Sequence, residues 1–497
     1  MNQLSPLLTL GIVAAYFLVL LLVSYLTGKD SGNDNFFLAG RKSPWYLVAF
    51  GMIGASLSGV TFISVPGAVG AGGKNMAFSY MQMVFGYLVG YAVIATVLLP
   101  LYYKHNLISI YGYLEKRFGY YSYKTGAFFF LLSRILGASF RLFLVAMVLQ
   151  LFVMDAFNIP FWTTVLATIV LIWVYTFRGG INTIVWTDSL QTFCMLLAVG
   201  LTILSIGNAL DKSVGELINL VQASDYSQIF FFQGGWSDPN NFFKQFISGA
   251  FIAIVMTGLD QDMMQKNLSC RTLRESQKNV FTFSIILIFA NMLFLMLGAL
   301  LYIYATNIGL SIPERTDQLF PLIAFEHLGP ITGIVFVLGL IAAAYSSADS
   351  ALTSLTTSFC VDFLNFEKID LTEEEKKRKR FLVHIGFSLV LFTVILIFNA
   401  LNNDSVISKI LEWAGYTYGP LLGLFSFGIF TNLKIRDRFV IPICILAPIL
   451  SYILNIYDLF IGFKLGFLII VINGLLTFLG LWVISYYSEE EEEQGSN

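Results

Sequence analysis

A run of hydroxyl-bearing residues surrounds one acidic residue in an otherwise apolar part of the sequence. Eight of the thirteen residues 346–358 are Ser or Thr, and Asp349 lies among them. Ser346 and Ser350 are four residues apart and would share one face of a helix. Hard cations prefer oxygen ligands such as carboxylates, carbonyls and hydroxyls. The run therefore predicts a dry oxygen site for sodium, although Ser and Thr can instead bond back to carbonyls of their own helix.

A second stretch, residues 51–67, mixes glycine and proline with hydroxyl groups. Glycine weakens a helix and proline removes an amide donor. A helix broken inside a membrane leaves backbone carbonyls free to bind cations. Close helix packing is the alternative, because small residues let backbones approach one another. We favour a broken helix whose free carbonyls face the hydroxyl run. The hydroxyl residues of this stretch are Ser56, Ser58, Thr61 and Ser64.

Ionisable residues also occur inside apolar segments, where they are costly and indicate function. Asp188 begins one such segment, whereas Asp260 and Asp262 lie near Lys266 and a basic loop and could simply pair there. Arg134 and Arg141 are seven residues apart on one helix face. Either arginine could bind a substrate carboxylate through two parallel hydrogen bonds, or could neutralise a buried aspartate. The sequence leaves open which arginine faces a solute.

The elements that would position these residues are membrane helices. The 497 residues are 57% hydrophobic and 12% charged, and residues 43–73 and 75–103 contain no Asp, Glu, Lys or Arg. A bilayer-spanning helix needs about 20 such residues, and barrel strands are about half as long. We therefore predict an all-α polytopic membrane protein of about 13 transmembrane helices. The predicted spans are 6–27, 46–72, 78–104, 125–154, 157–178, 183–208, 244–265, 277–306, 323–362, 378–400, 406–431, 438–456 and 461–486.

The ninth of these spans is too long for one straight crossing. We expect it to begin as a surface segment near Pro321 or Pro330 and then to cross.

Basic residues predict the orientation of these spans. With the N-terminus outside, 21 Lys and Arg residues, Lys266 included, fall in cytoplasmic segments and 3 fall in exterior ones. Such a bias fits an odd number of crossings. We expect a cell-membrane protein with an exterior N-terminus and a cytoplasmic, acidic C-terminal tail.

Several function classes find little support. The net charge of −2 gives no hint of a nucleic-acid partner. The four cysteines and three histidines are too scattered for a metal cluster or a disulfide framework. We find no catalytic or nucleotide-binding domain and predict that the protein is not an enzyme.

Taken together, the motifs resemble those of the sodium:solute symporters, the family of the bacterial sodium/galactose, sodium/proline and sodium/sialic acid carriers. The resemblance covers nearly the whole chain. The motifs are Asp34-Asn-Phe-Phe-Leu-Ala-Gly-Arg41, the Gly-Ala-Ser…Pro-Gly stretch at 54–67, Trp186-Thr-Asp188, Asp260-Gln261 with Gln265, Ser346-Ser347 and Gly419-Pro420.

The resemblance implies a leucine-transporter-type inverted repeat of five plus five helices, with discontinuous helices. The regions would be residues 1–45 (first span and cytoplasmic loop), 46–208 (first repeat), 209–243 (extracellular loop), 244–431 (second repeat) and 432–497 (two peripheral spans and the tail).

The family resemblance also implies the ion sites. The main sodium site would use carbonyls of Gly54, Leu57 and Ala343 and hydroxyls of Ser346 and Ser347. A second site, present in some members, would correspond to Asp188, Ser346 and Ser350. Asp349 replaces a serine of those members. It could strengthen a second cation site or make that site proton-linked.

The implied solute site is less well defined. The arginine that the sialic acid carriers use aligns cleanly with neither Arg134 nor Arg141. The sugar carriers have Gln at the position of Thr61 or Glu412, and neither residue is Gln here, so a typical hexose site is doubtful. The predicted solute-binding residues are Ser56, Ser58, Thr61, Phe78, Gln82, Arg141, Asp260, Gln261 and Glu412.

We therefore expect a monomer or weak dimer in the lipid bilayer that carries a small polar solute, such as a sugar, sialic acid or carboxylate, together with Na+ by alternating access. The rival readings are a passive channel, a sensor derived from a transporter, and a proton-pumping membrane subunit. A proton-pumping subunit would need a chain of buried Lys, Glu and His, whereas this sequence clusters Ser, Thr and Asp.

Overall fold

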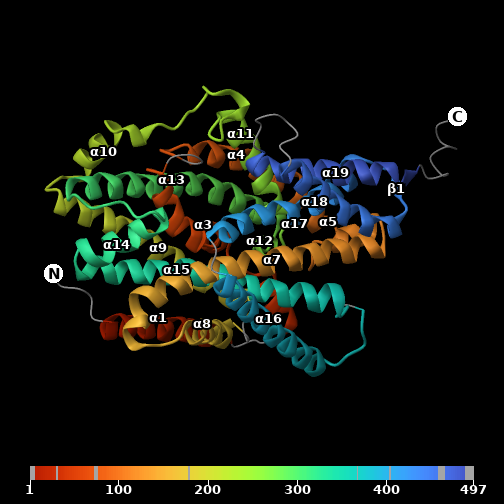
Figure 1. The fold of residues 1–497 in the computed structure, drawn as a ribbon. Coiled ribbons are helices and arrows are strands. Elements are labelled where there is room, and N and C mark those ends of the chain that lie inside the picture. The colour runs from red at the N-terminus through yellow and green to blue at the C-terminus, as the bar shows by residue number, and fades with distance from the viewer. Residues whose placement is uncertain are drawn as a thin grey trace.

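The computed structural model describes residues 6–28, 32–71, 76–176, 180–366, 368–401, 404–456 and 465–486. These residues form a bundle of long helices that run along a common axis (Figure 1). The only paired strands in this part of the chain are β1 (Lys434–Ile435) and β2 (Ser485–Tyr486), which are antiparallel. The prediction of an all-α architecture is confirmed.

The helices have the following bounds: α1 (Pro6–Thr27), α2 (Asn33–Leu38), α3 (Trp45–Ala68), α4 (Tyr80–Val93), α5 (Leu99–Lys104), α6 (Gly112–Arg117), α7 (Tyr120–Leu149), α8 (Phe161–Thr176), α9 (Ile181–Ala209), α10 (Val214–Gln222), α11 (Phe242–Ala253), α12 (Gln261–Leu268), α13 (Leu273–Asn307), α14 (Leu319–Leu322), α15 (Pro330–Ser358), α16 (Glu373–Leu401), α17 (Asp404–Phe430), α18 (Val440–Ile456) and α19 (Ile469–Val483). Short π-helical segments extend five of them: η2 (Ile94–Leu98), η3 (Gln150–Met154), η7 (Ile254–Gly258), η9 (Ile323–His327) and η10 (Phe359–Phe363).

The described part of the chain contains nine helices that are long and apolar enough to cross a membrane, or eleven if two bent pairs each count as one span. The shorter apolar helix α8 adds a further segment of 16 residues. A multi-pass membrane protein is thus confirmed, while the number thirteen stays a prediction.

One bent pair lies where the sequence predicts a broken helix. Within α3, Ser58 adopts φ 44° and ψ 169°, and the segments on either side differ in direction by 60°. Each helical carbonyl bonds the amide four residues later, so a break at Ser58 separates the carbonyls of residues 54–57 from their usual donors. The break therefore lies in the stretch where the sequence predicts free carbonyl oxygens.

The second bent pair was not predicted. The span expected at 244–265 is divided into α11, which runs on through η7, and α12, at an angle of 66°. Asp260 begins α12 as its N-cap, accepting hydrogen bonds from the amides of Asp262 and Met263. Asp is a preferred N-cap residue, so the break has a local cause.

The ninth predicted span contains a new helix start at Pro330, while the surface segment expected ahead of it stays a prediction. Helix α15 begins at Pro330, after the short α14 that contains Pro321. Proline is favoured at the first helical position because it lacks the amide that would be unpaired there.

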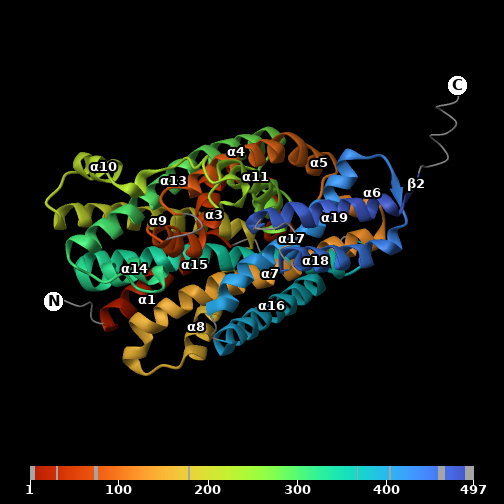
Figure 2. The same ribbon diagram turned by 45° about the horizontal axis from the view of Figure 1, so that its top comes forward.

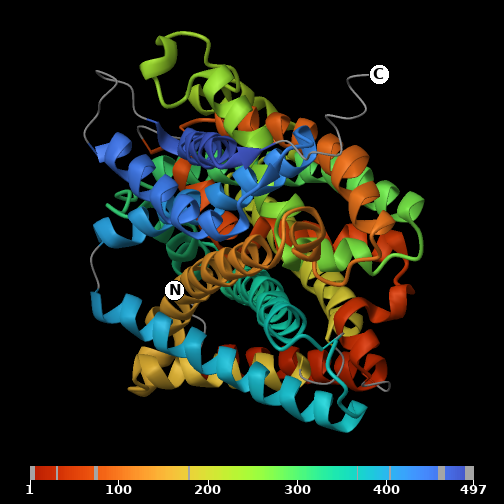
Figure 3. The ribbon, with the colours of Figure 1, turned by 90° about the vertical axis from the view of Figure 1, so that its right-hand side faces the viewer.

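Helix α15 lies in the middle of the bundle. It packs against α3, α7 and α9, and Figures 2 and 3 show it enclosed, with α1, α8 and α16 along one side and α18 and α19 along another. All residues of α15 from Gly339 to Ser358 are buried. The hydroxyl run therefore faces protein on every side, where each polar group needs a partner.

Candidate functional site

The break of α3 lies directly against α15 and α7. A Cβ atom placed on Gly59 would lie 2.7 Å from Val145 Cγ2 and 3.8 Å from the Cα of Ala344. The Gly-rich stretch and the hydroxyl run therefore meet at the break, and α7 closes the third side.

Helix α9 also packs against the Gly-rich stretch of α3. The amide of Gly54 donates to Thr192 Oγ1 at 3.0 Å, and a Cβ on Gly54 would lie 2.3 Å from that oxygen. Only glycine fits this position without moving α9, because the crowding comes from the branched Cβ of Thr192 as well as its hydroxyl.

Replacing Gly54 by alanine should therefore displace α3 from α9 and lower sodium affinity by about 5- to 150-fold, since overpacking costs about 1–3 kcal/mol. Sodium-dependent thermal stabilisation of the purified protein measures this. Gly200→Ala is the matched control, because a Cβ on Gly200 in α9 meets nothing within 4 Å. Equal effects of the two changes would contradict the proposed crowding.

The residues predicted for the main sodium site belong to α3 and α15, the two helices that meet at this junction. Leu57, Ala343, Ser346 and Ser347 are all buried. The Ser347 hydroxyl finds no hydrogen-bond partner among the described residues. An unpaired buried hydroxyl is costly, and a bound cation would remove that cost. The donor set of carbonyls and hydroxyls therefore fits sodium.

Two buried ion pairs hold α12 against the neighbouring helices. On one side, Lys266 Nζ lies 2.7 Å from Asp188 Oδ2 on α9. On the other, Arg134 of α7 donates to Asp262 and lies 3.8 Å from Asp260 Oδ2. All five side chains are at most 7% exposed. The pairs fix the position of α12 because breaking a buried pair leaves an uncompensated charge.

The location of Lys266 differs from the prediction of the sequence analysis, which places this residue in a cytoplasmic loop. It is 1% exposed and lies inside the bundle. The bend before α12 turns this helix inward and carries the lysine with it.

Helix α15 contributes a hydroxyl to each of these ion pairs. Ser346 Oγ donates to Asp188 Oδ1 at 3.0 Å, and Ser350 Oγ donates to Asp262 Oδ2 at 3.2 Å. Asp349 instead faces α8, where it accepts from the Tyr175 hydroxyl at 2.8 Å, and it also accepts from the amide of Ser350. Asp188, Asp349 and Ser350, predicted together for a second sodium site, therefore each have a different partner.

The two arginines of α7 differ sharply. Arg134 is engaged by Asp260 and Asp262, whereas Arg141 makes no hydrogen bond or ion pair with the described residues. Arg141 is half-buried and lies one turn before Val145, the residue that contacts the break of α3. An unpaired guanidinium beside the break can receive an anion.

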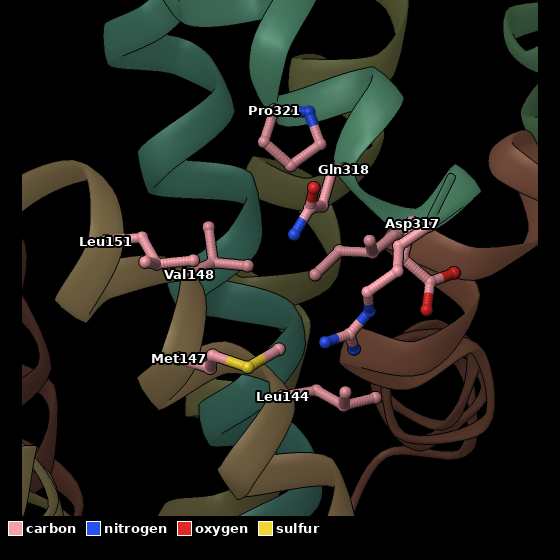
Figure 4. Close-up of a pocket in the computed structure, with 9 residues that line it drawn as sticks. Leu144, Met147, Val148, Leu151, Asp317, Gln318 and Pro321 are labelled. Carbon is pink, nitrogen blue, oxygen red and sulfur yellow. The ribbon is translucent and has the colours of Figure 1, made fainter. Parts of the chain in front are cut away.

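A pocket opens on the other side of Arg141 from the Arg134 pairs. Its lining includes Ile63 of α3, and Figure 4 shows Asp317, Gln318 and Pro321 facing side chains of α7 and η3. Burial raises the pKa of the Asp317 carboxyl, against the lowering effects of Ser64 and Arg315. The nine lining residues are Ile63, Leu144, Met147, Val148, Leu151, Arg315, Asp317, Gln318 and Pro321.

The residues predicted to bind the solute divide into two groups. Ser56, Ser58 and Thr61 lie at the break of α3. The side chains of Gln82 and Gln261 are instead used to hold backbone. The Gln82 amide bonds Ser79, Phe231 and Asn240, which tethers the 209–243 loop to α4.

Gln261 holds a different segment, bonding the amide of Ile110 and the carbonyl of Ile108. Phe78 is buried just before α4, and its amide donates to the carbonyl of Gln228 in the same 209–243 loop that Gln82 holds. Asp260 serves as a helix cap and a partner of Tyr418, whose hydroxyl donates to it at 2.7 Å. The side chain of Glu412 lies outside the described residues.

Four residues of the site were not predicted as such: Lys266, Tyr418, Tyr175 and Thr192. Lys266 could have been noticed from its spacing, since it follows Asp262 by four residues on a helix that starts with a capping aspartate. The other three are uncharged and carry no local signal.

The comparisons with known proteins agree with this geometry. Residues 36–434 match the sodium:solute symporter family. A sodium/sialic acid symporter of Aliivibrio fischeri is 26% identical over 91% of this chain and 89% of its own length. A sodium/sialic acid symporter of Proteus mirabilis is 24% identical over 94% of both chains, and the human sodium/iodide cotransporter is 24% identical over 82% of this chain.

Solved structures show the same fold. A substrate-bound, outward-open Na+-coupled sialic acid symporter superposes with a TM-score of 0.81 at 21% identity, covering 96% of this chain and 97% of the other. The nucleobase-cation symporter Mhp1, in a closed conformation, has a TM-score of 0.57 at 13% identity and covers 92% of this chain.

Proposed function

The chain belongs to the sodium:solute symporter family, and from this premise we propose that it couples sodium to the uptake of a small organic anion that carries a carboxylate. Sodium-coupled symport is the activity of the protein. The chemical class of the solute, the residues that bind it and the ligands of the ion are the proposal.

Arg141 is the observation that carries the solute class. It is a half-buried guanidinium with no ionic partner among the described residues, beside the break of α3. Burying a cation is costly unless it is paired, so a solute anion would complete the site. Relatives named for sialic acid, monocarboxylates and iodide all carry anions, which supports this class.

Ser56, Ser58 and Thr61 complete the proposed solute site with hydroxyls that suit the polar groups of a sugar acid. The pocket lined by Ile63 and Val148 would lead from the exterior to Arg141, because Val148 follows Arg141 by two helical turns on one face. The Arg134 and Lys266 ion pairs would close the cytoplasmic side beneath it. Phe78 would form part of the exterior wall.

The proposed coupling ion lies between the carbonyls of Gly54, Leu57 and Ala343 and the hydroxyls of Ser346 and Ser347. Ser346 donates its only proton to Asp188, which leaves its lone pairs free for a cation. Sodium would join α3 to α15 and favour the outward-open state in which the solute binds. Release inward then requires α12 to leave its ion pairs.

The transporter architecture is proposed as one leading span, two inverted five-helix repeats over 46–208 and 244–431, and two peripheral spans. The two bent helices, α3 and α11–α12, stand first in these repeats, which supports the assignment. Helix α1 begins at one end of the bundle and β2 lies at the other (Figures 1 and 2), which supports thirteen crossings with an exterior N-terminus and a cytoplasmic C-terminus. We propose a monomer or weak dimer.

Uptake into proteoliposomes tests the function. We expect N-acetylneuraminic acid or a short monocarboxylate to accumulate under an inward sodium gradient and not under a potassium gradient. Uncharged hexose should neither accumulate nor compete. Sodium-independent equilibration would favour a passive channel, binding without uptake would favour a sensor, and uptake driven by protons alone would contradict sodium coupling.

Ser347→Ala tests the main sodium site. Loss of a hydroxyl ligand to a cation costs about 1.5–3 kcal/mol, so the sodium concentration for half-maximal uptake should rise about 10- to 150-fold. Ser354→Ala is the matched control on the same helix, because the Ser354 hydroxyl already bonds the carbonyl of Ala351. An unchanged sodium dependence in Ser347→Ala would remove this residue from the site.

A further inference from the structure

Lys266 places a positive charge where the sequence predicts a second sodium ion. Its ammonium lies 2.7 Å from Asp188 Oδ2, and the other oxygen of this carboxylate accepts from Ser346. Lys266, Asp188 and Ser346 are each at most 1% exposed. A buried carboxylate needs one compensating cation, and the chain itself supplies it here.

We propose that Lys266 is an internal cation that takes the place of a second sodium, so that this transporter couples one sodium to each solute. The inference rests on the proposed function, because it concerns the stoichiometry of the same ion site. It assigns to Lys266 the role of balancing Asp188 and keeping that carboxylate from a second ion.

The other predicted ligands of a second sodium support this assignment. Asp349 accepts from the Tyr175 hydroxyl and the Ser350 amide, and Ser350 donates both to Asp262 and to the carbonyl of Ser346. These side chains are therefore satisfied without an ion. A sodium ion at Asp188 would also lie within a few ångströms of the Lys266 ammonium, in a dry interior where like charges repel strongly.

The internal cation also acts on the proposed main site. Ser346 belongs to both arrangements, and its proton points to Asp188. With Asp188 neutralised by Lys266, the serine oxygen remains available to a single sodium between α3 and α15. Removing the lysine charge should instead leave Asp188 and Ser346 able to bind another cation.

The number of bound ions tests the inference directly. We would measure equilibrium binding of radioactive 22Na+ to the purified full-length protein. We expect about one ion per wild-type chain and about two per Lys266→Met chain, in which the Hill coefficient for sodium activation of uptake should rise from about 1 toward about 2. Lys266→Arg keeps the charge and should bind one ion. Lys266→Met with Asp188→Asn removes both charges and should also bind one.

A wild-type chain that binds two ions, or a Lys266→Met chain that binds only one, would overturn the inference while leaving sodium coupling intact. A wild-type chain that neither binds sodium nor shows sodium-dependent uptake would instead overturn the proposed function. The two failures are therefore distinguishable.

Membrane potential provides a second measurement that needs no variant, in case Lys266→Met fails to fold. One sodium with one monovalent anion is electroneutral, so an interior-negative potential of ~100 mV should change solute accumulation less than about twofold. Coupling to two ions would raise it about 50-fold, the factor that corresponds to one net charge at this potential. A rise of that size would contradict the inference.

Discussion

Replacement of Arg141 by methionine should abolish most solute uptake. The buried partner of a charge pair contributes about 2–5 kcal/mol to binding, so the kcat/KM for a carboxylate solute should fall by about 30-fold to several thousand-fold. Methionine keeps much of the side-chain volume but lacks the guanidinium. Lys212→Met is the matched control, since it removes an exposed charge from the 209–243 loop.

A solute analogue sharpens this test. The carboxamide of the same solute lacks the negative charge that Arg141 would bind. The affinity of the wild-type protein for the carboxamide should be about as low as the affinity of Arg141→Met for the acid. The Arg141→Met variant should bind the acid and the carboxamide with similar affinity. Sodium-dependent thermal stabilisation of Arg141→Met should persist, because the arginine is no ligand of the ion. A variant that transports the acid with an unchanged KM would exclude Arg141 from the solute site.

Replacement of Arg134 by methionine should destabilise the protein most. It would leave Asp262 buried without a compensating charge, beside Asp260, which costs about 3–5 kcal/mol. The melting temperature and the half-life of the purified protein in detergent measure this. Because the pair holds α12 to α7, we also expect the cytoplasmic side to open more readily.

The change at Arg134 has a rescue and a matched control. Adding Asp262→Asn to Arg134→Met removes the unpaired charge and should restore most of the lost stability. Lys368→Met breaks the ion pair with Glu115. The Lys368 side chain is 64% exposed, and an exposed pair contributes only about 0–1 kcal/mol. Equal losses in Arg134→Met and Lys368→Met, or no rescue by Asp262→Asn, would contradict the buried-pair interpretation.

Some features of the site could not be predicted from the sequence, because they depend on the rotation and register of packed helices. The sequence analysis treats Arg134 and Arg141 alike, since both lie on one face of α7. The inward bend before α12 brings Asp260 and Asp262 to Arg134, whereas Arg141 makes no hydrogen bond or ion pair with the described residues. The arginines therefore acquire different roles from a neighbour that is far away in the chain.

Lys266 shows the same dependence more strongly. Counting basic residues placed Lys266 with the cytoplasmic loops, because that count uses only position along the chain. The bend and the capping Asp260 instead turn it toward Asp188, 78 positions earlier in the chain. Similarly, Gln82 and Gln261 look like solute ligands in the sequence but hold backbone segments in the structure.

By itself, the sequence determined the membrane class, the all-helical architecture and a broken helix within residues 51–67. Each follows from local composition: charge-free length demands lipid-spanning helices, and glycine next to hydroxyl groups weakens one of them. Only the tertiary structure decided which buried charges are paired, because a pair requires two side chains from separate helices to reach the same few ångströms. That geometry arises when the helices pack and bend, and no spacing along one segment contains it.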